Sequence, residues 1–215
     1  MNYDEIWFIE NNIIKIHVIY IYFNFGKVCK LKKSTDKVKV CYSLLRNNNL
    51  NLASLKYGKS REEWAIKSLE KKHSIKVGKC GFFVDNNIPY LGATPDGIID
   101  NEYIVEVKCA AISCNSIKEA VNNKKIKYLK FLENENKYQL KRNSDYFYQV
   151  QGQLHIAKRQ YCYFVVYIPK GKPHIELISY DEKFWKDNII NKLDEFYKKS
   201  LPSRISERVP CRGSI

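Results

Sequence analysis

Two carboxylates and a lysine near the middle of the chain are spaced as in a site for phosphodiester hydrolysis. Asp96 lies in a Pro-Asp-Gly turn, and Glu106 and Lys108 follow with Val107 between them. Two carboxylates held close together repel each other unless a hard cation lies between them, and Mg²⁺ prefers carboxylate oxygens, water and phosphate as ligands. The pattern therefore predicts a metal site with a lysine beside it.

A short hairpin would bring these three side chains together. Residues 102–109 are rich in Ile, Val and Tyr and are predicted to form a strand, in which Glu106 and Lys108 point to one face and apolar side chains to the other. A tight reversal at Asp100-Asn101 folds the Pro-Asp-Gly turn back along this strand. Asp96 is then expected to meet Glu106 across the hairpin.

Each of these motifs also has a plainer interpretation. Glu106-Val107-Lys108 alone would be an exposed alternation in an edge strand, and Asp96-Gly97 alone would be an ordinary turn. The apolar face formed by Val105, Val107 and Cys109 weighs against this interpretation. The same strand then places both of its charges on the other face, beside a second carboxylate.

At these residues the chain resembles the PD-(D/E)xK nucleases, and within them the YqaJ-like viral recombinase nucleases related to phage lambda exonuclease. Upstream, Tyr57-Gly58 followed by Glu62 is similar to the start of the family's helix that carries a carboxylate near the metal. Downstream, Tyr146-x-x-Gln149-x-Gln151 resembles its Tyr-x-x-Gln-x-Gln helix. The resemblance implies an α/β fold with a central mixed β-sheet flanked by helices, the restriction-endonuclease-like core.

The resemblance also implies an activity, which is Mg²⁺-dependent exonucleolytic hydrolysis of duplex DNA, with Mn²⁺ able to substitute. A lysine beside the metal would orient water and offset charge in the transition state. By this resemblance the catalytic residues are Glu62, Asp96, Glu106, Lys108 and Gln149, the metal ligands are Asp96, Glu106, Glu62 and the carbonyl of Val107, and the DNA contacts include Tyr146 and Gln151.

The segment before Phe25-Gly26 departs from the family pattern and leaves two other functions open. The family usually has an Arg there to hold the terminal 5′-phosphate of DNA, and residues 18–24 contain none. Lys30, Lys32 and Lys33 could bind that phosphate instead, as point charges. The alternatives are a catalytically inactive DNA-binding derivative of a mobile-element nuclease and a structure-selective endonuclease of the same fold.

A single globular domain is the simplest organisation. The chain has 215 residues, 45% of them hydrophobic, and no linker rich in Gly, Ser or Pro divides it. We assign residues 24–202 to a YqaJ-like nuclease domain and residues 203–215 to a C-terminal tail. Residues 1–23 show none of the family pattern and are predicted to be a diverged or spurious N-terminal segment.

The formal net charge of +14 indicates a polyanionic partner. Lysines on a groove release counterions from a phosphate backbone without reading its sequence, so DNA is the expected partner. Lys124, Lys125 and Lys127 lie in a basic stretch interleaved with aromatic residues and are candidate DNA contacts. About half of these lysines would form a solvated face in the plainer interpretation.

The cysteines and the apolar N-terminal stretch bear on compartment and partners. Seven cysteines show neither disulfide-like nor zinc-like spacing, which indicates reduced thiols in an intracellular compartment, the nucleus if the source is eukaryotic. Charged residues interrupt every window long enough to span a bilayer, so we expect no membrane span and no signal peptide. A single-strand-annealing recombinase and a homo-oligomer are the candidate protein partners that the family implies.

Hydrophobic periodicity predicts alternating helices and strands. Helices are expected at 34–46, 60–73, within 116–134, and at 145–158 and 182–199. Strands are expected at 75–84, 89–92, 97–100, 102–109, 161–168 and 173–180.

Overall fold

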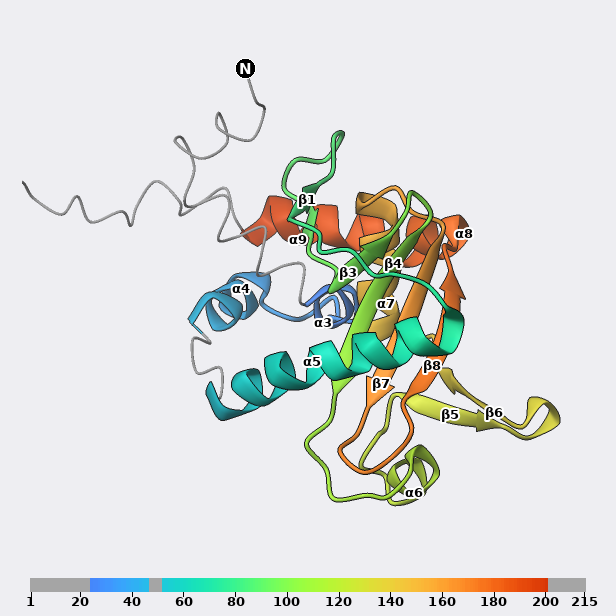
Figure 1. Cartoon of the computed structure of the whole chain (residues 1–215). Helices are drawn as coiled ribbons and strands as arrows, with labels where there is room; N and C mark the ends of the chain where they lie inside the picture. Colours follow the sequence, from blue (N-terminus) through green and yellow to red (C-terminus); the bar gives the residue numbers. More distant parts are fainter. Residues whose placement is uncertain (1–23, 47–51, 201–215) are drawn as a thin grey trace, which may run out of the picture.

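A four-stranded mixed sheet forms the centre of this computed structural model, which describes residues 24–46 and 52–200 (Figure 1). The strand order is β3-β4-β7-β8, with bounds β3 Gly97–Ile99, β4 Tyr103–Cys109, β7 Tyr161–Tyr167 and β8 His174–Ser179. β4 runs parallel to β7, and the outer strands β3 and β8 pair antiparallel to them. β4 is therefore an interior strand, and the edge-strand interpretation of its Glu-Val-Lys segment is wrong.

Helices cover both faces of the sheet, as the α/β prediction requires. α5 (Leu52–His73) crosses one face, and α7 (Asp145–Ile156) lies on the other (Figure 1). Val105 and Val107 pack beneath Ala65 of α5, whereas Ile104 packs with the apolar side chains of α7, including Leu154. The predicted alternation of β4 between two faces is thus confirmed.

A further layer of helices covers the outer side of α7. It consists of α3 (Phe25–Cys29), α4 (Lys37–Arg46), α8 (Glu182–Phe184), the π-helical turn η2 (Trp185–Ile190) and α9 (Asn191–Ser200). Their apolar side chains, among them Phe25, Ile189 and Phe196, form one cluster with Tyr148 and Ile156 of α7. α7 is therefore enclosed on two sides, and even its glutamines are buried.

The contact between α3 and α7 depends on two glycines. A Cβ atom on Gly26 would lie 2.4 Å from the Cα atom of Asp145, and one on Gly152 would lie 2.1 Å from Cε2 of Phe25. Phe25 is completely buried, so its ring cannot move aside into solvent. The Phe25-Gly26 pair noted in the sequence is the part of α3 that makes this close approach.

Gly152→Ala is expected to destabilise the protein by roughly 1–3 kcal/mol, the usual cost of overpacking a filled core. The added methyl group would push against the Phe25 ring and separate α3 from α7. Urea unfolding followed by circular dichroism measures the change. Gly81→Ala is the matched control, because a Cβ atom at Gly81 meets nothing within 4 Å. Equal stability of the two variants would contradict the prediction.

Two regions differ from the predicted secondary structure. The predicted strand at 75–84 contains only a bridge between Gly78 and Ile98 and the short strand β1 (Phe83–Val84), which pairs with β2 (Gly92–Ala93). The region 116–134 contains a helix, α6 (Ile117–Asn122), but then forms a hairpin. Its strands are β5 (Leu129–Leu132) and β6 (Lys137–Leu140), joined by the 3-10 turn η1 (Glu133–Glu135). The prediction of helical segments within 116–134 is therefore confirmed only for α6, because β5 and η1 occupy the C-terminal part of that range.

The remaining predicted elements overlap the observed ones, although α5 begins at Leu52 rather than at residue 60. Side-chain caps explain several boundaries. Ser144 accepts a hydrogen bond from the Phe147 N–H and starts α7, and Asp181 accepts one from the Phe184 N–H and starts α8. Asp100 has a left-handed backbone, with φ of 44°, at the predicted reversal before β4. This reversal is the link that folds the β3–β4 hairpin.

The terminal segments, the absence of a membrane span and the state of the cysteines were also predicted from the sequence. The predicted N-terminal segment 1–23 and tail 203–215 lie outside the described residues. Within residues 24–46 and 52–200, no helix is long and apolar enough to cross a membrane. Cys162 is completely buried in the core, while Cys109 is only partly buried at the end of β4.

Candidate active site

Asp96 extends the β3–β4 hairpin through both its backbone and its side chain. Its N–H donates to the carbonyl of Val105 at 2.9 Å, and its Oδ2 atom accepts a hydrogen bond from the Val107 N–H at 2.6 Å. The N–H and C=O of one strand residue point to the same side, so the Val107 carbonyl lies on the side of β4 that Asp96 occupies. The structure thus brings Asp96 and the Val107 backbone together.

Glu106 is a buried carboxylate surrounded by hydrogen-bond donors. Its side chain is only 3% exposed, and Lys108 donates to its Oε1 atom. Gln149 donates to the same oxygen at 2.9 Å, and Gln153 donates to Oε2 at 2.6 Å. A buried charge is tolerated only when it is paired and hydrogen-bonded, and these three donors meet that requirement.

The carboxylates of Glu62, Asp96 and Glu106 influence one another's ionisation. Burial raises the pKa of Asp96 well above its usual range, and the charges of Glu106 and Glu62 raise it further. Burial also raises the pKa of Glu62 on α5, with Glu106 as the next cause. Carboxylates that disfavour one another's ionisation form an environment that a cation would stabilise. The three predicted carboxylates, Glu62, Asp96 and Glu106, therefore lie close enough to interact electrostatically.

Lys108 supplies the positive charge of the site. Burial lowers the pKa of Lys108, but the charges of Glu106 and Asp96 outweigh this and raise it above the ordinary lysine value. The ammonium group therefore stays protonated. Its Nζ atom lies 4.8 Å from the ring centroid of Tyr146, the second residue of α7. Such a cation–π contact orients the lysine without consuming its donors.

The donor set suits a hard divalent cation, although it is not a closed cage. Among the described residues, no group of three His, Cys, Asp or Glu side chains is placed to hold a metal by itself. Mg²⁺ commonly binds through one or two carboxylates and leaves other positions to water and phosphate. Asp96 and Glu106 supply two carboxylates for such a site, and the Val107 carbonyl supplies a third oxygen. Glu62 on α5 is a further carboxylate that could take part.

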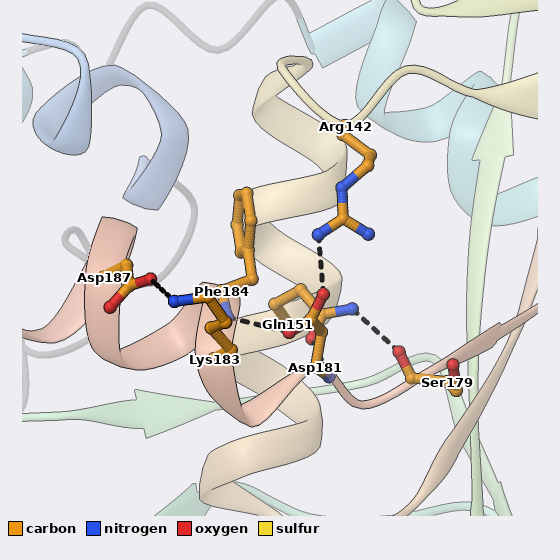
Figure 2. A network of polar contacts seen from close by, with 7 residues as sticks. All are labelled: Arg142, Gln151, Ser179, Asp181, Lys183, Phe184 and Asp187. Carbon is orange, nitrogen blue, oxygen red and sulfur yellow. Dashed lines mark hydrogen bonds and ion pairs between the residues drawn. The ribbon is translucent and has the colours of Figure 1, made fainter.

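Gln153 belongs to the candidate site although it is not among the predicted site residues, and the prediction of Gln151 as a DNA contact is wrong. Gln151 is fully buried and faces the connection between β8 and α8 (Figure 2). Its Nε2 atom donates to the Ser179 carbonyl at 3.0 Å, and its Oε1 atom accepts from the Asp181 N–H at 2.8 Å. The structure does not support Gln151 as a DNA contact, because both ends of its amide are occupied by backbone.

The same connection is tied to the start of α7 by a surface ion pair. Arg142 donates to Asp181 Oδ2 at 2.6 Å, and Asp181 Oδ1 caps α8 (Figure 2). The Arg142 hydrogen bond is the main cause that lowers the pKa of Asp181. Gln151 and Arg142 therefore position α7 from its outer side, while Gln149 and Gln153 face the active site.

The candidate DNA-binding lysines lie in two places. Lys30 pairs with Asp145 and donates to the Asn143 carbonyl at 3.1 Å, at the N-terminus of α7, and Lys32 and Lys33 are exposed in the turn that follows α3. The second group is exposed between α6 and β5, beyond the carboxyl end of β4, and consists of Lys124, Lys125 and Lys127 (Figure 1). Both groups remain candidates for phosphate contacts.

Comparison with known proteins agrees with this architecture. A crystal structure of an alkaline exonuclease, LHK-Exo, from Laribacter hongkongensis superimposes with a TM-score of 0.61 and 17% sequence identity, covering 86% of this chain and 91% of that chain. The structure of LHK-Exo in complex with dAMP gives a TM-score of 0.59 and 16% identity, over 86% and 93% of the two chains. No curated protein sequence matches this chain.

The structural likeness establishes the fold, which is the restriction-endonuclease-like core of the predicted class. Family assignment rests on sequence. The model of the YqaJ-like viral recombinase domain matches residues 24–160, which include Asp96, Glu106, Lys108 and Gln149. This match spans more than half of the sequence, and the chain therefore belongs to the YqaJ-like viral recombinase domain family.

Proposed function

We propose that this protein is a Mg²⁺-dependent nuclease that hydrolyses duplex DNA from an end. The observation that carries the proposal is the convergence of Lys108 and two glutamines on Glu106, a carboxylate buried within an interior strand. Buried charges cost folding free energy, and coupled titratable groups of this kind cluster at functional sites. Family membership and the alkaline exonuclease with the same fold support the exonuclease form of the activity.

The metal would be held by Asp96, Glu106 and the Val107 carbonyl, with Glu62 at the same ion or at a second one. A bound divalent cation supplies Lewis-acid polarisation of the phosphate and lowers the pKa of bound water, and Mn²⁺ could replace Mg²⁺ in this task. Asp96 is already positioned by the Val107 N–H. Gln149 and Gln153 hold the Glu106 carboxylate in one orientation, so little reorganisation is needed on binding.

Lys108 has a separate task. Its ammonium group remains protonated because two carboxylates raise its pKa, and it lies on the same face of β4 as Glu106. In the transition state of phosphodiester hydrolysis, negative charge grows on the phosphoryl oxygens. Lys108 would transfer a hydrogen bond from Glu106 to these oxygens or to the attacking water. Tyr146 directs the ammonium group and stands where substrate would contact the start of α7.

The DNA would approach along the basic surface at the carboxyl end of β4. Exposed Lys124, Lys125 and Lys127 lie beyond that end, and contacts of this kind are independent of sequence. The dAMP in the complexed exonuclease of the same fold supports a deoxynucleotide substrate for this chain. The proposal includes a homo-oligomer and an annealing recombinase as candidate partners, which the family resemblance implies.

Purified protein with Mg²⁺ is expected to degrade linear duplex DNA to small products and to leave covalently closed circles intact. Chelation by EDTA should stop the reaction, because the carboxylates lose their cation. Added Mg²⁺ or Mn²⁺ should restore it. Gel analysis of both substrates and chromatography of the products measure this. Cutting of closed circles would instead identify an endonuclease. Metal-independent DNA binding without cleavage of either substrate would identify an inactive derivative.

A further inference from the structure

The β5–β6 hairpin projects from the body of the protein (Figure 1). One face of the hairpin is apolar and becomes exposed toward its outer end. The pair Leu129 and Leu140 lies at its base and is 99% buried, since each is only 1% exposed. The next pair on the same face is Phe131 and Tyr138, with ring centroids 5.0 Å apart. Phe131 is 43% exposed. An exposed aromatic side chain on a projecting hairpin indicates a surface that can bind a partner.

This aromatic pair lies on the same face of the sheet as the active site and at the same level. Tyr138 contacts the ring of His174 at the start of β8, at a centroid distance of 6.3 Å. His174 is in register with Val166, and Val166 is in register with Lys108. Two strand spacings of about 4.8 Å therefore separate Lys108 from His174, a distance of about 10 Å. A nucleic acid at the active site would extend over the hairpin.

The hairpin is held firmly relative to the catalytic lysine. The Leu140 N–H donates to Glu176 Oε2 at 2.7 Å, and the Lys141 N–H donates to the Tyr128 carbonyl at 2.8 Å. Tyr128 makes an edge-to-face contact with Tyr146, at 4.7 Å between ring centroids. Tyr146 in turn contacts Lys108. The base of the hairpin and the active site therefore share one packed aromatic group.

The charge of this region identifies the partner as a polyanion. Residues 124–141 contain six lysines and two glutamates, and one of these glutamates, Glu135, is paired with Lys137. Lys127 and Lys130 are exposed on either side of the Tyr128–Leu129 base. Aromatic rings interleaved with exposed lysines are typical of single-stranded nucleic-acid surfaces, where bases stack and the backbone meets positive charge. In the interior of a duplex the base faces are already stacked and cannot meet an aromatic ring.

We propose that the β5–β6 hairpin binds single-stranded DNA, with bases stacking on Phe131 and Tyr138. The strand is the one left unpaired when its complement is hydrolysed at Lys108, and in this respect the inference rests on the proposed function. The hairpin keeps that strand away from the active site while the duplex advances. Its binding needs no metal and no cleavage, so it can be tested separately from the nuclease.

Phe131→Ala in the full chain is expected to weaken binding of a fluorescein-labelled single-stranded oligodeoxynucleotide roughly tenfold, because the stacking surface of a base is lost. Fluorescence anisotropy at fixed salt in EDTA measures the affinity. Phe131→Trp should retain it. Leu177→Ala is the matched control, since Leu177 is 51% exposed on β8 but points to the opposite face of the sheet. Blunt duplex should bind the Phe131→Ala variant almost as well as the wild type.

Unchanged single-strand affinity in Phe131→Ala would overturn the proposal. If the sedimentation coefficient of this variant shifted as well, the hairpin would instead be an interface between copies of the chain. Circular dichroism checks the fold of each variant, and rescue by Trp excludes a folding defect. If the wild type binds single strands through Phe131 but cleaves no DNA, the hairpin proposal stands and the nuclease proposal fails.

Discussion

Glu106→Gln is expected to abolish Mg²⁺-dependent cleavage, with a fall in rate of at least roughly 10³-fold. Cation binding and charge stabilisation of the transition state each depend on this carboxylate, and losing several kcal/mol of such stabilisation corresponds to that factor. The replacement also turns an acceptor toward the Gln149 or Gln153 amide into a donor, so the site loses its fixed geometry as well. Single-turnover digestion of labelled linear duplex measures the rate.

The matched control is Glu176→Gln. Glu176 lies on the same face of the sheet and at the same level, because Glu106 is in register with Phe164 and Phe164 with Glu176. Its carboxylate contacts the Leu140 backbone and the His174 ring rather than Lys108 or the glutamines of α7, and a glutamine there keeps an oxygen that can accept from the Leu140 N–H. Cleavage should survive this change. Asp96→Asn should behave like Glu106→Gln, and both should bind DNA in EDTA nearly as well as the wild type, since the basic surface carries binding. A cleavage rate equal to that of the wild type in either variant would contradict the assignment of the active site.

The placement of the two carboxylates could be predicted because it is local. Asp96 and Glu106 are joined by one short hairpin, and the alternation of β4 determines which side chains share a face. A reversal at Asp100 was visible as a turn dipeptide in the sequence. Every step from residue type to position was short-range, so the prediction needed no knowledge of the rest of the fold.

The roles of the glutamines on α7 were only partly predictable. Helical spacing places Gln149 and Gln153 on one stripe and Gln151 on the other side of the helix. It does not say which element each side meets. The outer helices enclose α7, and Gln151 therefore faces the β8–α8 connection rather than DNA. That layer depends on contacts between residues more than a hundred positions apart, such as Cys29 with Ile189.

The β5–β6 hairpin is not predictable from its local sequence, for a different reason. Its apolar residues Leu129, Phe131 and Leu132 also fit a helical spacing, and short apolar runs do not distinguish the two structures. The turn favours the hairpin, because Asn136 adopts a left-handed backbone with φ of 45° there. Anchoring by Glu176 on β8 then fixes the hairpin in place. Tertiary contacts decided between two locally acceptable conformations.

Lys108→Met is expected to slow cleavage by roughly 10²–10³-fold, the usual loss when one donor to a developing negative charge is removed. Met removes the ammonium group and its cation–π contact with Tyr146 but keeps most of the apolar part of the side chain, so the packing of α7 should change little. Glu106 keeps its hydrogen bonds from Gln149 and Gln153 and is not left without donors. Lys183→Ala, which removes an exposed lysine paired with Asp187, is the control and should leave the rate unchanged.

The affinity for metal should move in the opposite direction from the rate. In the wild type the Lys108 ammonium group occupies Glu106 Oε1, so an incoming cation competes with it for the carboxylate. Removing that positive charge should let Lys108→Met bind Mn²⁺ at least as tightly as the wild type, as measured by isothermal titration calorimetry. Slow turnover with intact or tighter Mn²⁺ binding separates a transition-state role from a structural one. If Mn²⁺ binding and turnover fell together, Lys108 would act by organising the site, and its proposed contact with the phosphate would be wrong.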